Sequence, residues 1–295
     1  MSITERLANL SFPTVIITII VLLGLRWVLL KQKVPIAKTV AEFAESLAVA
    51  MGLVFLIIRP FFVQAFFIPS ASMEPTLLVH DHILVNKLVY RFREPKLGDV
   101  VVFKAPLAAT PGEDKEKDFI KRVIGVPGDL VRITPGYVIV GQTQYDHRYL
   151  ENVLRGYAAL NGGGKVKLTD NKVLVDGKPV SLAEVAAAVG EPNAKVKVVP
   201  GKVYINGRVI DEPYTAEDPD TEYPLLSGPR ATNPEWIVTK NGVHYVKIPK
   251  GKLLVMGDNR NDSNDARFWG LLDRKRVLGK AMFVFWPLTR IKWVR

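Results

Sequence analysis

Two long apolar segments near the N-terminus constrain the fold of this chain more than any other feature. They run from Phe12 to Leu30 and from about Val40 to Ile58, and each is 19 residues long. A helix of about 20 apolar residues crosses the hydrocarbon core of a bilayer. Two buried helices of a soluble protein are the alternative, but the length and adjacency of the segments favour a membrane. We therefore predict a membrane anchor at residues 1–62, with spanning helices at about 12–30 and 40–59.

Local signals indicate where the second helix starts and how the anchor is oriented. Thr39 and Glu42 have the spacing of a capping box, which predicts a helix start near Thr39. Basic residues are concentrated between the two segments rather than before them: Lys31, Lys33 and Lys38 against Arg6. The positive-inside rule then places the loop 31–39 in the cytoplasm and the chain after Arg59 on the outer face. No net positive charge precedes the first segment and no small-residue cleavage site follows it, so we expect it to be retained.

From Phe66 onward, short β-type runs alternate with turns, which predicts a mainly β, antiparallel fold. Asp176-Gly177 and Asn206-Gly207 have the preferred chemistry of two-residue hairpin turns. They lie in similar segments, Lys172–Val180 and Lys202–Ile210, which are offset by 30 residues. Because two copies do not make a repeat protein, we expect two similar hairpins in one small β-domain.

Two segments depart from this β pattern. Ser181 and Glu184 form a second capping box and open an Ala-rich helix that Gly190 is expected to end. We expect it to be the only substantial helix beyond the anchor. The segment Tyr214–Asn241 is rich in Pro, Asp, Glu and Gly, which predicts a long loop.

Three dense motifs lie toward the two ends of the β region. They are residues 66–77 (Phe-Phe-Ile-Pro-Ser-Ala-Ser-Met-Glu-Pro-Thr-Leu), 119–129 (Phe-Ile-Lys-Arg-Val-Ile-Gly-Val-Pro-Gly-Asp) and 257–267 (Gly-Asp-Asn-Arg-Asn-Asp-Ser-Asn-Asp-Ala-Arg). The stretch between the second and third motifs carries none. This distribution predicts a catalytic β-core at 63–134 and 246–295, interrupted by an inserted β-rich domain at 135–245.

Composition excludes several kinds of site. The chain has no cysteine, so it has no disulfide, thiolate metal site or cysteine nucleophile. The net charge of +11 is compatible with nucleic-acid binding, but the basic residues form no run of five and no nucleic-acid motif is present. Anionic lipid beside a membrane protein explains the charge equally well. We predict no nucleic-acid partner, no metal and no cofactor, and full activity in EDTA.

The three motifs, in this order behind two apolar segments, resemble those of bacterial type I signal peptidases, also called leader peptidases. The resemblance implies a membrane-bound serine endopeptidase that removes signal peptides from exported preproteins through an acyl-enzyme. It implies that Ser72 is the nucleophile and Lys121 the general base. It further implies that the Ser70 hydroxyl and the Ser72 N–H form the oxyanion hole, and that Ser263 orients Lys121.

The resemblance also implies supporting roles for charged residues of the second and third motifs: Arg122, Asp258, Asp265 and Arg267. Of these, Asp265 and Arg267 match the family's supporting ion pair. Two positions depart from the family pattern, because Asn261-Asp262 reverses the usual order and Ala266 is often Ser. The departures put the contacts of the loop in doubt and leave the catalytic atoms in place.

The sequence around Lys121 suits a general base. A serine hydroxyl needs a base within hydrogen-bond reach, and a neutral lysine can serve in place of histidine. The apolar neighbours Phe119, Ile120 and Val123 would desolvate the amine and lower its pKa from about 10.4. Strand alternation turns Arg122 to the opposite face, where it can pair with a carboxylate. The four histidines lack a motif context and are interpreted as surface or structural residues: His80, His82, His147 and His244.

Signal peptides carry small residues before the cut, which implies shallow apolar pockets in the enzyme. Candidate walls flank the catalytic residues: Phe66, Ile68, Pro69, Met73, Leu77, Phe119 and Ile120. An extended peptide would add as a strand beside the Ser72 segment, and the apolar stretch Phe61–Phe67 would lie against the bilayer. The expected partners are preprotein signal peptides, membrane lipid and nearby export machinery. We expect a monomer in the bacterial cytoplasmic membrane, with its catalytic domain on the extracytoplasmic side.

Three other functions stay open. A family member that has lost catalysis would be a membrane-anchored binding module, but Ser72 and Lys121 are both present. A structural envelope protein would need neither the Ser-x-Ser-Met turn nor a lone lysine in an apolar strand. A soluble protease with a histidine-based triad would lose activity when one histidine is replaced by alanine, whereas we expect activity to survive all four replacements.

Overall fold

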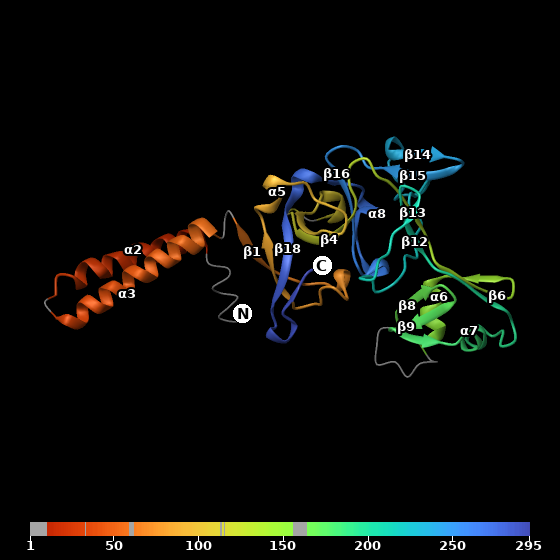
Figure 1. Ribbon diagram of the computed structural model, residues 1–295, viewed down its shortest axis with the longest axis horizontal. Coiled ribbons are helices and arrows are strands. Elements are labelled where there is room, and N and C mark those ends of the chain that lie inside the picture. The colour runs from red at the N-terminus through yellow and green to blue at the C-terminus, as the bar shows by residue number, and fades with distance from the viewer. Residues whose placement is uncertain (1–10, 33, 59–61, 113, 115, 156–163) are drawn as a thin grey trace.

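The computed structural model describes residues 11–32, 34–58, 62–112, 114, 116–155 and 164–295. A pair of N-terminal helices extends from a β-rich body (Figure 1). Every strand pairing among the described residues is antiparallel. The predicted mainly β, antiparallel fold behind two N-terminal helices is therefore confirmed.

The helices are α2 (Phe12–Leu29) and α3 (Pro35–Gly52), which continues into a π-helical stretch, η1 (Leu53–Ile58). α3 packs against α2, and its buried residues are alanines, which let the two backbones approach closely: Ala37, Ala41, Ala44 and Ala48. Arg26 and Glu45 form an ion pair of 2.8 Å between the two helices.

The predicted start of the second helix near Thr39 is wrong. The helix begins at Pro35, because proline has a backbone angle suited to the first helical turn. The loop predicted at 31–39 is correspondingly shorter. The helix from Pro35 to Leu56 is long and apolar enough to cross a membrane, whereas the apolar helix Pro13–Leu29 is shorter. The predicted end of the second span, at residue 59, lies outside the described residues.

The largest sheet brings the three motifs together. Its strands, in spatial order, are β1 (Val63–Phe67), β2 (His82–Asn86), β18 (Val277–Trp286), β3 (Val100–Lys104), β4 (Asp118–Gly125), β16 (Lys252–Met256) and β17 (Leu272–Asp273), and β19 (Lys292–Trp293) pairs with β18. The first motif begins at the end of β1 and continues beyond it, the second begins on β4, and the third follows β16. Since β4 pairs with β16, the second and third motifs are neighbours in the sheet.

The remaining strands form one five-stranded and two three-stranded sheets. The five-stranded sheet has the order β13 (Arg208–Val209), β12 (Lys202–Ile205), β5 (Leu130–Thr134), β15 (Val243–Lys247) and β14 (Ile237–Lys240). The smaller sheets are β11 (Val196–Val199), β6 (Tyr137–Val140) and β7 (Thr143–Tyr145), and β10 (Lys178–Val180), β9 (Lys172–Val175) and β8 (Val166–Thr169). Helices α6 (His147–Leu154) and α7 (Leu182–Ala188) pack against strands of the smaller sheets, and α5 (Val89–Phe92) and α8 (Ala266–Trp269) are single turns in the body.

The two predicted hairpin turns are present, but the two hairpins lie in different sheets. Asp176 and Asn206 both have positive φ angles, of 47° and 53°, as type I′ turns require. The first hairpin belongs to the β10-β9-β8 sheet and the second to the five-stranded sheet. Turn chemistry fixes a hairpin locally and does not choose its neighbouring strand, so the two similar segments do not share a sheet.

The predicted Ala-rich helix is confirmed, while two other expectations around it are wrong. α7 has the full capping box of Ser181 and Glu184, and Gly190 follows it with a φ of 86°. α6 is a further helix beyond the two N-terminal ones, and Asp146 caps it by accepting from the Tyr149 N–H. The segment predicted as a loop up to Asn241 ends in β14, which a hairpin turn joins to β15.

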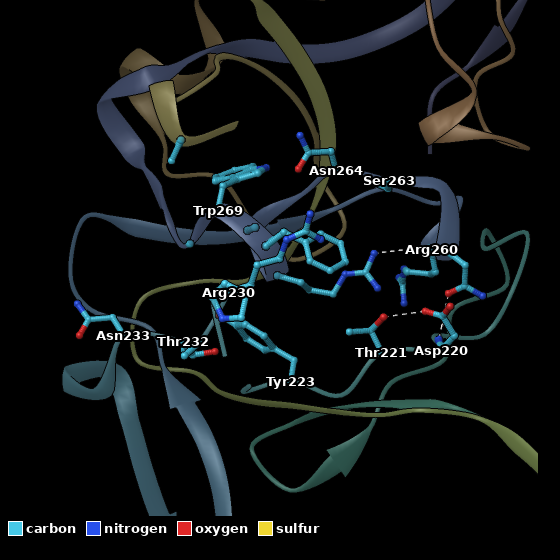
Figure 2. A pocket seen from close by; sticks show the side chains of 18 of the residues that line it. Asp220, Thr221, Tyr223, Arg230, Thr232, Asn233, Arg260, Ser263, Asn264 and Trp269 are labelled. Atoms are coloured by element: carbon cyan, nitrogen blue, oxygen red, sulfur yellow. Dashed lines mark hydrogen bonds between the residues drawn. The ribbon is translucent and has the colours of Figure 1, made fainter. Parts of the chain in front are cut away.

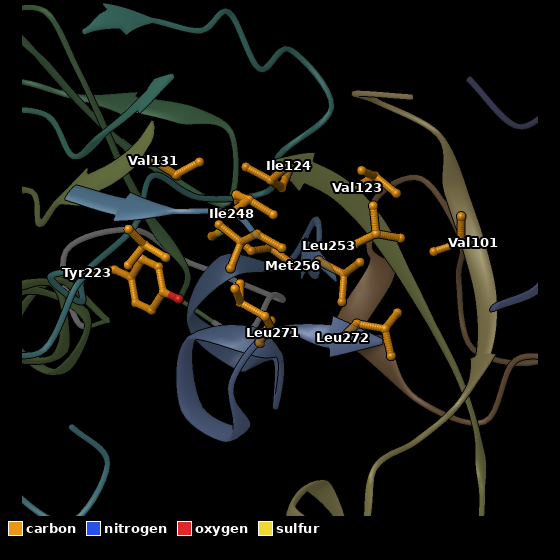
Figure 3. Packing of buried hydrophobic residues seen from close by; sticks show 14 of the residues in the cluster. Val101, Val123, Ile124, Val131, Tyr223, Ile248, Leu253, Met256, Leu271 and Leu272 are labelled. Carbon is orange, nitrogen blue, oxygen red and sulfur yellow. The ribbon is translucent and has the colours of Figure 1, made fainter. Parts of the chain in front are cut away.

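Buried apolar residues divide into three clusters, of which two matter for domain organisation. The first joins the largest sheet to the five-stranded sheet (Figure 3) and includes Val123, Val131 and Tyr223. The second is separate and runs from Val138 to Val198. Its elements gather at the end of the molecule away from α2 and α3 (Figure 1). The domain boundaries stay a prediction, although some residues of the range 135–245, such as Tyr223, pack in the first cluster.

Candidate active site

Ser72 lies in a single 3-10 turn, η2 (Ala71–Met73), directly after β1 and its exit through Pro69. Its side chain is nearly buried, with 8% exposure. The third motif holds this turn in place, because the Asn259 N–H donates to the Ser72 carbonyl at 3.2 Å and Asn259 Nδ2 donates to the Ala71 carbonyl at 3.1 Å. The backbone of the first motif therefore rests on that of the third.

Lys121 projects from β4 to the same point. Its Nζ lies 2.7 Å from Ser72 Oγ and donates to it, and it also donates to the Ile120 carbonyl at 2.9 Å. Only 4% of the residue is exposed. Burial lowers the pKa of Lys121 from 10.5 to about 8, even though the nearby carboxylates of Asp265 and Asp258 favour the charged form. The site therefore holds an amine that can be neutral in mildly alkaline solution.

Arg122 does pair with a carboxylate, as the sequence predicts. Its Nε and one terminal nitrogen each donate to Asp258 at 2.7 Å, in a fork-like ion pair that is almost fully buried. The other terminal nitrogen donates to the Gly98 carbonyl, and the guanidinium stacks 3.9 Å from the Tyr214 ring centroid. Asp258 also accepts from the Thr76 hydroxyl at 2.5 Å. This ion pair ties β4 to the loop 257–267.

Asp265 and Arg267 form a second buried fork within the same loop. Both bonds measure 2.9 Å, and Asp265 also accepts from the Gly257 N–H at 3.0 Å. Burial alone would raise the pKa of the Asp265 carboxyl, but the Arg267 charge and hydrogen bonds hold it below its usual range. Arg267 also donates to the Arg260 carbonyl. The Asp265–Arg267 ion pair thus stabilises the loop internally, and the Arg122–Asp258 ion pair joins the loop to β4.

The two remaining serines differ in their contacts. Ser70 Oγ lies 3.4 Å from Ser72 Oγ and donates to it. Ser263 is nearly buried, and in the described part of the chain no hydrogen bond joins its Oγ to Lys121, although its hydroxyl helps to lower the pKa of the Asp265 carboxyl. A Cβ on Gly257 would overlap both Ser263 Oγ and the Ser72 carbonyl, so Ser263 still packs close to the Ser72 turn. The roles given to Ser70 and Ser263 stay predictions.

The candidate pocket walls fall into two groups. Ile68, Met73 and Leu77 are buried in the third apolar cluster, with Phe66 and Ile120 partly buried against it. Phe119 is partly buried and packs on Phe103, and Pro69 is exposed. Four residues around Ile68, Met73 and Leu77 therefore keep surface that a substrate could contact: Phe66, Pro69, Phe119 and Ile120. The wall assignment stays a prediction.

The histidines have partners away from Ser72. His147 is buried and its Nε2 lies 2.7 Å from Asp218 Oδ1, and His244 bonds to Thr239. His80 and His82 pack against the Phe67 ring. Within the described ranges, no group of three or more His, Cys, Asp or Glu side chains is placed to hold a metal ion.

Several residues that shape the site were not identified from the sequence. Arg260 is fully buried and forms a fork with Glu212, with bonds of 2.7 and 2.5 Å. Arg260 and Asn259 lie in the third motif, so their position was a usable signal. Glu212 had no signal, because it lies in an irregular segment with no motif and its partner is 48 residues away.

A cavity of about 1000 Å³ is lined in part by residues of the third motif. Figure 2 shows Tyr223, Arg230, Arg260 and Trp269 around it. Ser263 lines this cavity, whereas Ser72 and Lys121 do not. The loop 257–267 therefore has a second exposed side that is distinct from the Ser72–Lys121 contact.

Known proteins are similar in sequence to most of this chain. The family model described as signal peptidase, peptidase S26, matches residues 40–157 and 185–286. A probable signal peptidase I-2 of Synechocystis sp. is 30% identical over 261 residues, which cover 88% of this chain and 80% of that protein. A signal peptidase I of Aquifex aeolicus is 35% identical over 241 residues, or 78% of each chain.

A crystal structure of a signal peptidase I from Enterococcus faecalis matches with a TM-score of 0.26 and 16% identity, over 64% of this chain and 97% of that one. A likeness this weak carries no structural argument. The family model alone covers well over half of the sequence and includes all three motifs. The chain therefore belongs to the signal peptidase family, peptidase S26, and is a serine peptidase.

Proposed function

We propose that this chain is a membrane-bound endopeptidase that removes N-terminal signal peptides from exported preproteins, cutting after small residues. The relatives named signal peptidase I support the substrate class. The observation that carries the chemistry is the 2.7 Å contact between Lys121 Nζ and Ser72 Oγ in a buried setting. A lone lysine in such a setting, with its pKa lowered to about 8, suits a general base.

In the proposed reaction, neutral Lys121 takes the proton of the Ser72 hydroxyl while Oγ attacks the carbonyl carbon of the scissile bond. The Ser72 N–H and the Ser70 hydroxyl donate to the oxyanion that forms. The Lys121 ammonium then gives its proton to the leaving amine, which departs as the new N-terminus of the mature protein. Water attacks the acyl-enzyme with Lys121 again as base, which releases the signal peptide with a free carboxylate.

The two buried ion pairs both influence the charge of Lys121 in this mechanism, and one of them also holds its position. The carboxylates of Asp258 and Asp265 favour the Lys121 ammonium that forms during attack, whereas burial and Arg267 disfavour it. The balance keeps the amine able to accept and return a proton. The Arg122–Asp258 fork also holds β4 and the third motif at a fixed separation, so Nζ stays within reach of Oγ.

We further propose that α2 and α3 both span the bacterial cytoplasmic membrane, with their short loop inside and the β-rich body outside. α2 has 18 residues and would measure about 27 Å, close to the hydrocarbon thickness of about 30 Å. Arg26 lies near its end and pairs with Glu45 of α3, which compensates its charge within the anchor. Phe62 and Phe67 are exposed and would contact lipid, and Phe61 lies outside the described residues. The enzyme would act as a monomer near the export machinery.

The proposal is tested by preprotein cleavage in detergent and phospholipid. We expect Ser72→Ala and Lys121→Ala each to lose at least about 1000-fold in rate, as loss of a nucleophile or its base does. Lys247→Ala is the matched control, because Lys247 is an exposed strand lysine. Folding of each variant is checked by circular dichroism.

Other outcomes point to the remaining alternatives. Cleavage that persists in Lys121→Ala would return the histidines as candidate bases. No cleavage by the intact chain, with a confirmed signal-peptide substrate, would favour the inactive binding module. Full activity in EDTA is expected, and its loss would contradict a metal-free reaction.

A further inference from the structure

The segment 212–220, which lies within the predicted inserted region, contacts the third-motif loop at three places. Glu212 pairs with Arg260, and the Ala216 N–H donates to the Asp258 carbonyl at 3.1 Å. At the far end, the Asn261 side chain donates to Glu217 Oε2 at 2.7 Å and to the Asp218 carbonyl at 3.1 Å, and it accepts from the Asp220 N–H at 3.0 Å. The loop that supports Ser72 is thus held from outside as well as by its own ion pair.

The strongest of these three contacts is the ion pair between Glu212 and Arg260. Its two carboxylate oxygens accept from both terminal nitrogens of Arg260, whose side chain is fully buried. A buried guanidinium needs a paired carboxylate, because an isolated charge is very costly to remove from water. The third guanidinium nitrogen, Nε, donates to the Gly257 carbonyl at 3.1 Å. Glu212 therefore determines where Arg260 lies, and Arg260 fixes the start of the loop.

The start of the loop is the surface on which the Ser72 turn rests. Gly257 lies so close to the Ser72 carbonyl that a Cβ would overlap it, and the Asn259 N–H donates to that carbonyl. Tyr214 adds a link to the other side of the site, since its hydroxyl donates to Glu212 at 2.9 Å and its ring stacks on Arg122. One carboxylate is thus connected to both the serine turn and the lysine strand.

We propose that Glu212 is a positioning residue for the Ser72–Lys121 pair, acting through Arg260 and the loop 257–259. The inference rests on the proposed function and deepens it, because it gives a segment of the predicted inserted region a part in the active-site scaffold. Asn261 is the second fastening point. An aspartate at position 261 would place its carboxylate next to that of Glu217 and could not donate the hydrogen bonds that Asn261 makes. The order Asn261-Asp262 therefore suits the contacts with the segment 212–220.

The test compares Glu212→Gln with Asp211→Asn, which removes the same charge from the exposed neighbouring residue. Active sites are counted by titration with a serine-directed acylating reagent, so that rates refer to functional enzyme only. We expect kcat per titrated site to fall about 10- to 100-fold in Glu212→Gln, the cost of a misplacement of about 1 Å. KM should stay within about twofold, because Glu212 does not touch the substrate in this scheme. Glu212→Asp should recover part of kcat, since it keeps the charge.

The pH profile gives a readout that a purely structural role would leave unchanged. Lys121 is faced by Asp265, Asp258 and Arg267, which set its charge balance. Arg260 also interacts with Asp258. Without the Glu212 carboxylate, the Arg260 charge offsets more of the Asp258 charge, which then favours the Lys121 ammonium less. The acidic limb of kcat against pH should therefore move to lower pH in Glu212→Gln and stay in place in Asp211→Asn.

The outcomes separate this inference from the proposed function. If Glu212→Gln has a lower melting temperature but an unchanged kcat per titrated site and an unchanged pH profile, Glu212 is only structural and the inference is overturned. If Glu212→Gln does not fold, Asn261→Asp is measured in the same way, and an unchanged kcat per site there overturns it. If Lys121→Ala still cleaves, the proposed function itself fails, whatever Glu212→Gln does.

Discussion

At the scale of single residues, Lys121 is where stability and the proposed function oppose each other. Lowering its pKa from 10.5 to about 8 corresponds to a cost on the order of 3 kcal/mol for burying the charged form. The folded protein bears that cost in order to keep an amine that can lose its proton. Such conflicts between local stability and fold are expected at functional sites.

Replacing Lys121 by a similar apolar side chain should therefore stabilise the fold. Below pH 8 the lysine is charged in both the folded and the unfolded chain, so the burial cost is fully present; between about pH 8 and 10.5 only the unfolded chain is charged, and the cost declines. We expect Lys121→Met to raise the free energy of unfolding by about 1–3 kcal/mol at pH 7, with a smaller gain at pH 10. Thermal unfolding in detergent at both pH values measures this. A lower melting temperature at pH 7 would contradict it.

The identity of the site residues was largely predictable because they lie in motifs, while their supporting partners were not. The resemblance of the motifs implied that Ser72 and Lys121 act together, and strand alternation predicted the pairing of Arg122 with a carboxylate. Glu212 is a different case. Its role depends on a buried arginine that only the folded chain brings near, and no local pattern marks such a partner.

At the scale of elements, the site depends on one close contact between the turn η2 and the start of the loop 257–267. Gly257 provides that contact, since any side chain there would overlap the Ser72 carbonyl and Ser263 Oγ. Backbone atoms cannot give way as a flexible side chain can. The Ser72 turn must therefore shift if Gly257 gains a Cβ.

We expect Gly257→Ala to reduce kcat/KM at least about 100-fold, because a shift of about 1 Å in a reacting group has that effect. Adding Ser263→Ala should not restore activity, since the clash with the Ser72 carbonyl remains. Gly24→Ala is the control, as a Cβ there meets nothing within 4 Å. Near-normal cleavage of a preprotein by Gly257→Ala would show that the contact does not position Ser72.

Local sequence signals predicted helices and turns better than they predicted which strands lie side by side in a sheet. The capping box at Ser181 and the turns at Asp176 and Asn206 are correct because each depends on adjacent residues. The two hairpins nevertheless lie in different sheets, which is a matter of long-range packing. The capping box at Thr39 failed for a related reason: a stronger start signal, Pro35, precedes it by one turn.

At the scale of the whole molecule, one antiparallel sheet gathers motifs that are nearly 200 residues apart in the sequence. β4 pairs with both β3 and β16, so the lysine strand lies beside the strand that leads into the third motif. The helices α2 and α3 extend from the side of the body where β1 lies (Figure 1). This arrangement suits an enzyme whose serine turn follows directly after the strand that leaves the anchor.

The proposed topology can be measured with single cysteines, because the chain has none of its own. Gln32→Cys lies in the loop between α2 and α3, and Lys250→Cys lies in the body. In intact spheroplasts, we expect a membrane-impermeant maleimide to label the protein carrying Lys250→Cys and to label Gln32→Cys only after lysis. Labelling of Gln32→Cys before lysis would contradict the two-span anchor with a cytoplasmic loop.

The account depends most on Lys121 being the base that activates Ser72, and the pH dependence of Ser72 acylation tests this directly. The rate of modification by a serine-directed acylating reagent is followed from pH 5 to 10, and the labelled residue is identified by peptide mapping. We expect label on Ser72 and a rate that rises with pH, with a midpoint near about 8 as Lys121 loses its proton. A flat rate from pH 5 to 9, or label on a different residue, would contradict the Ser72–Lys121 assignment.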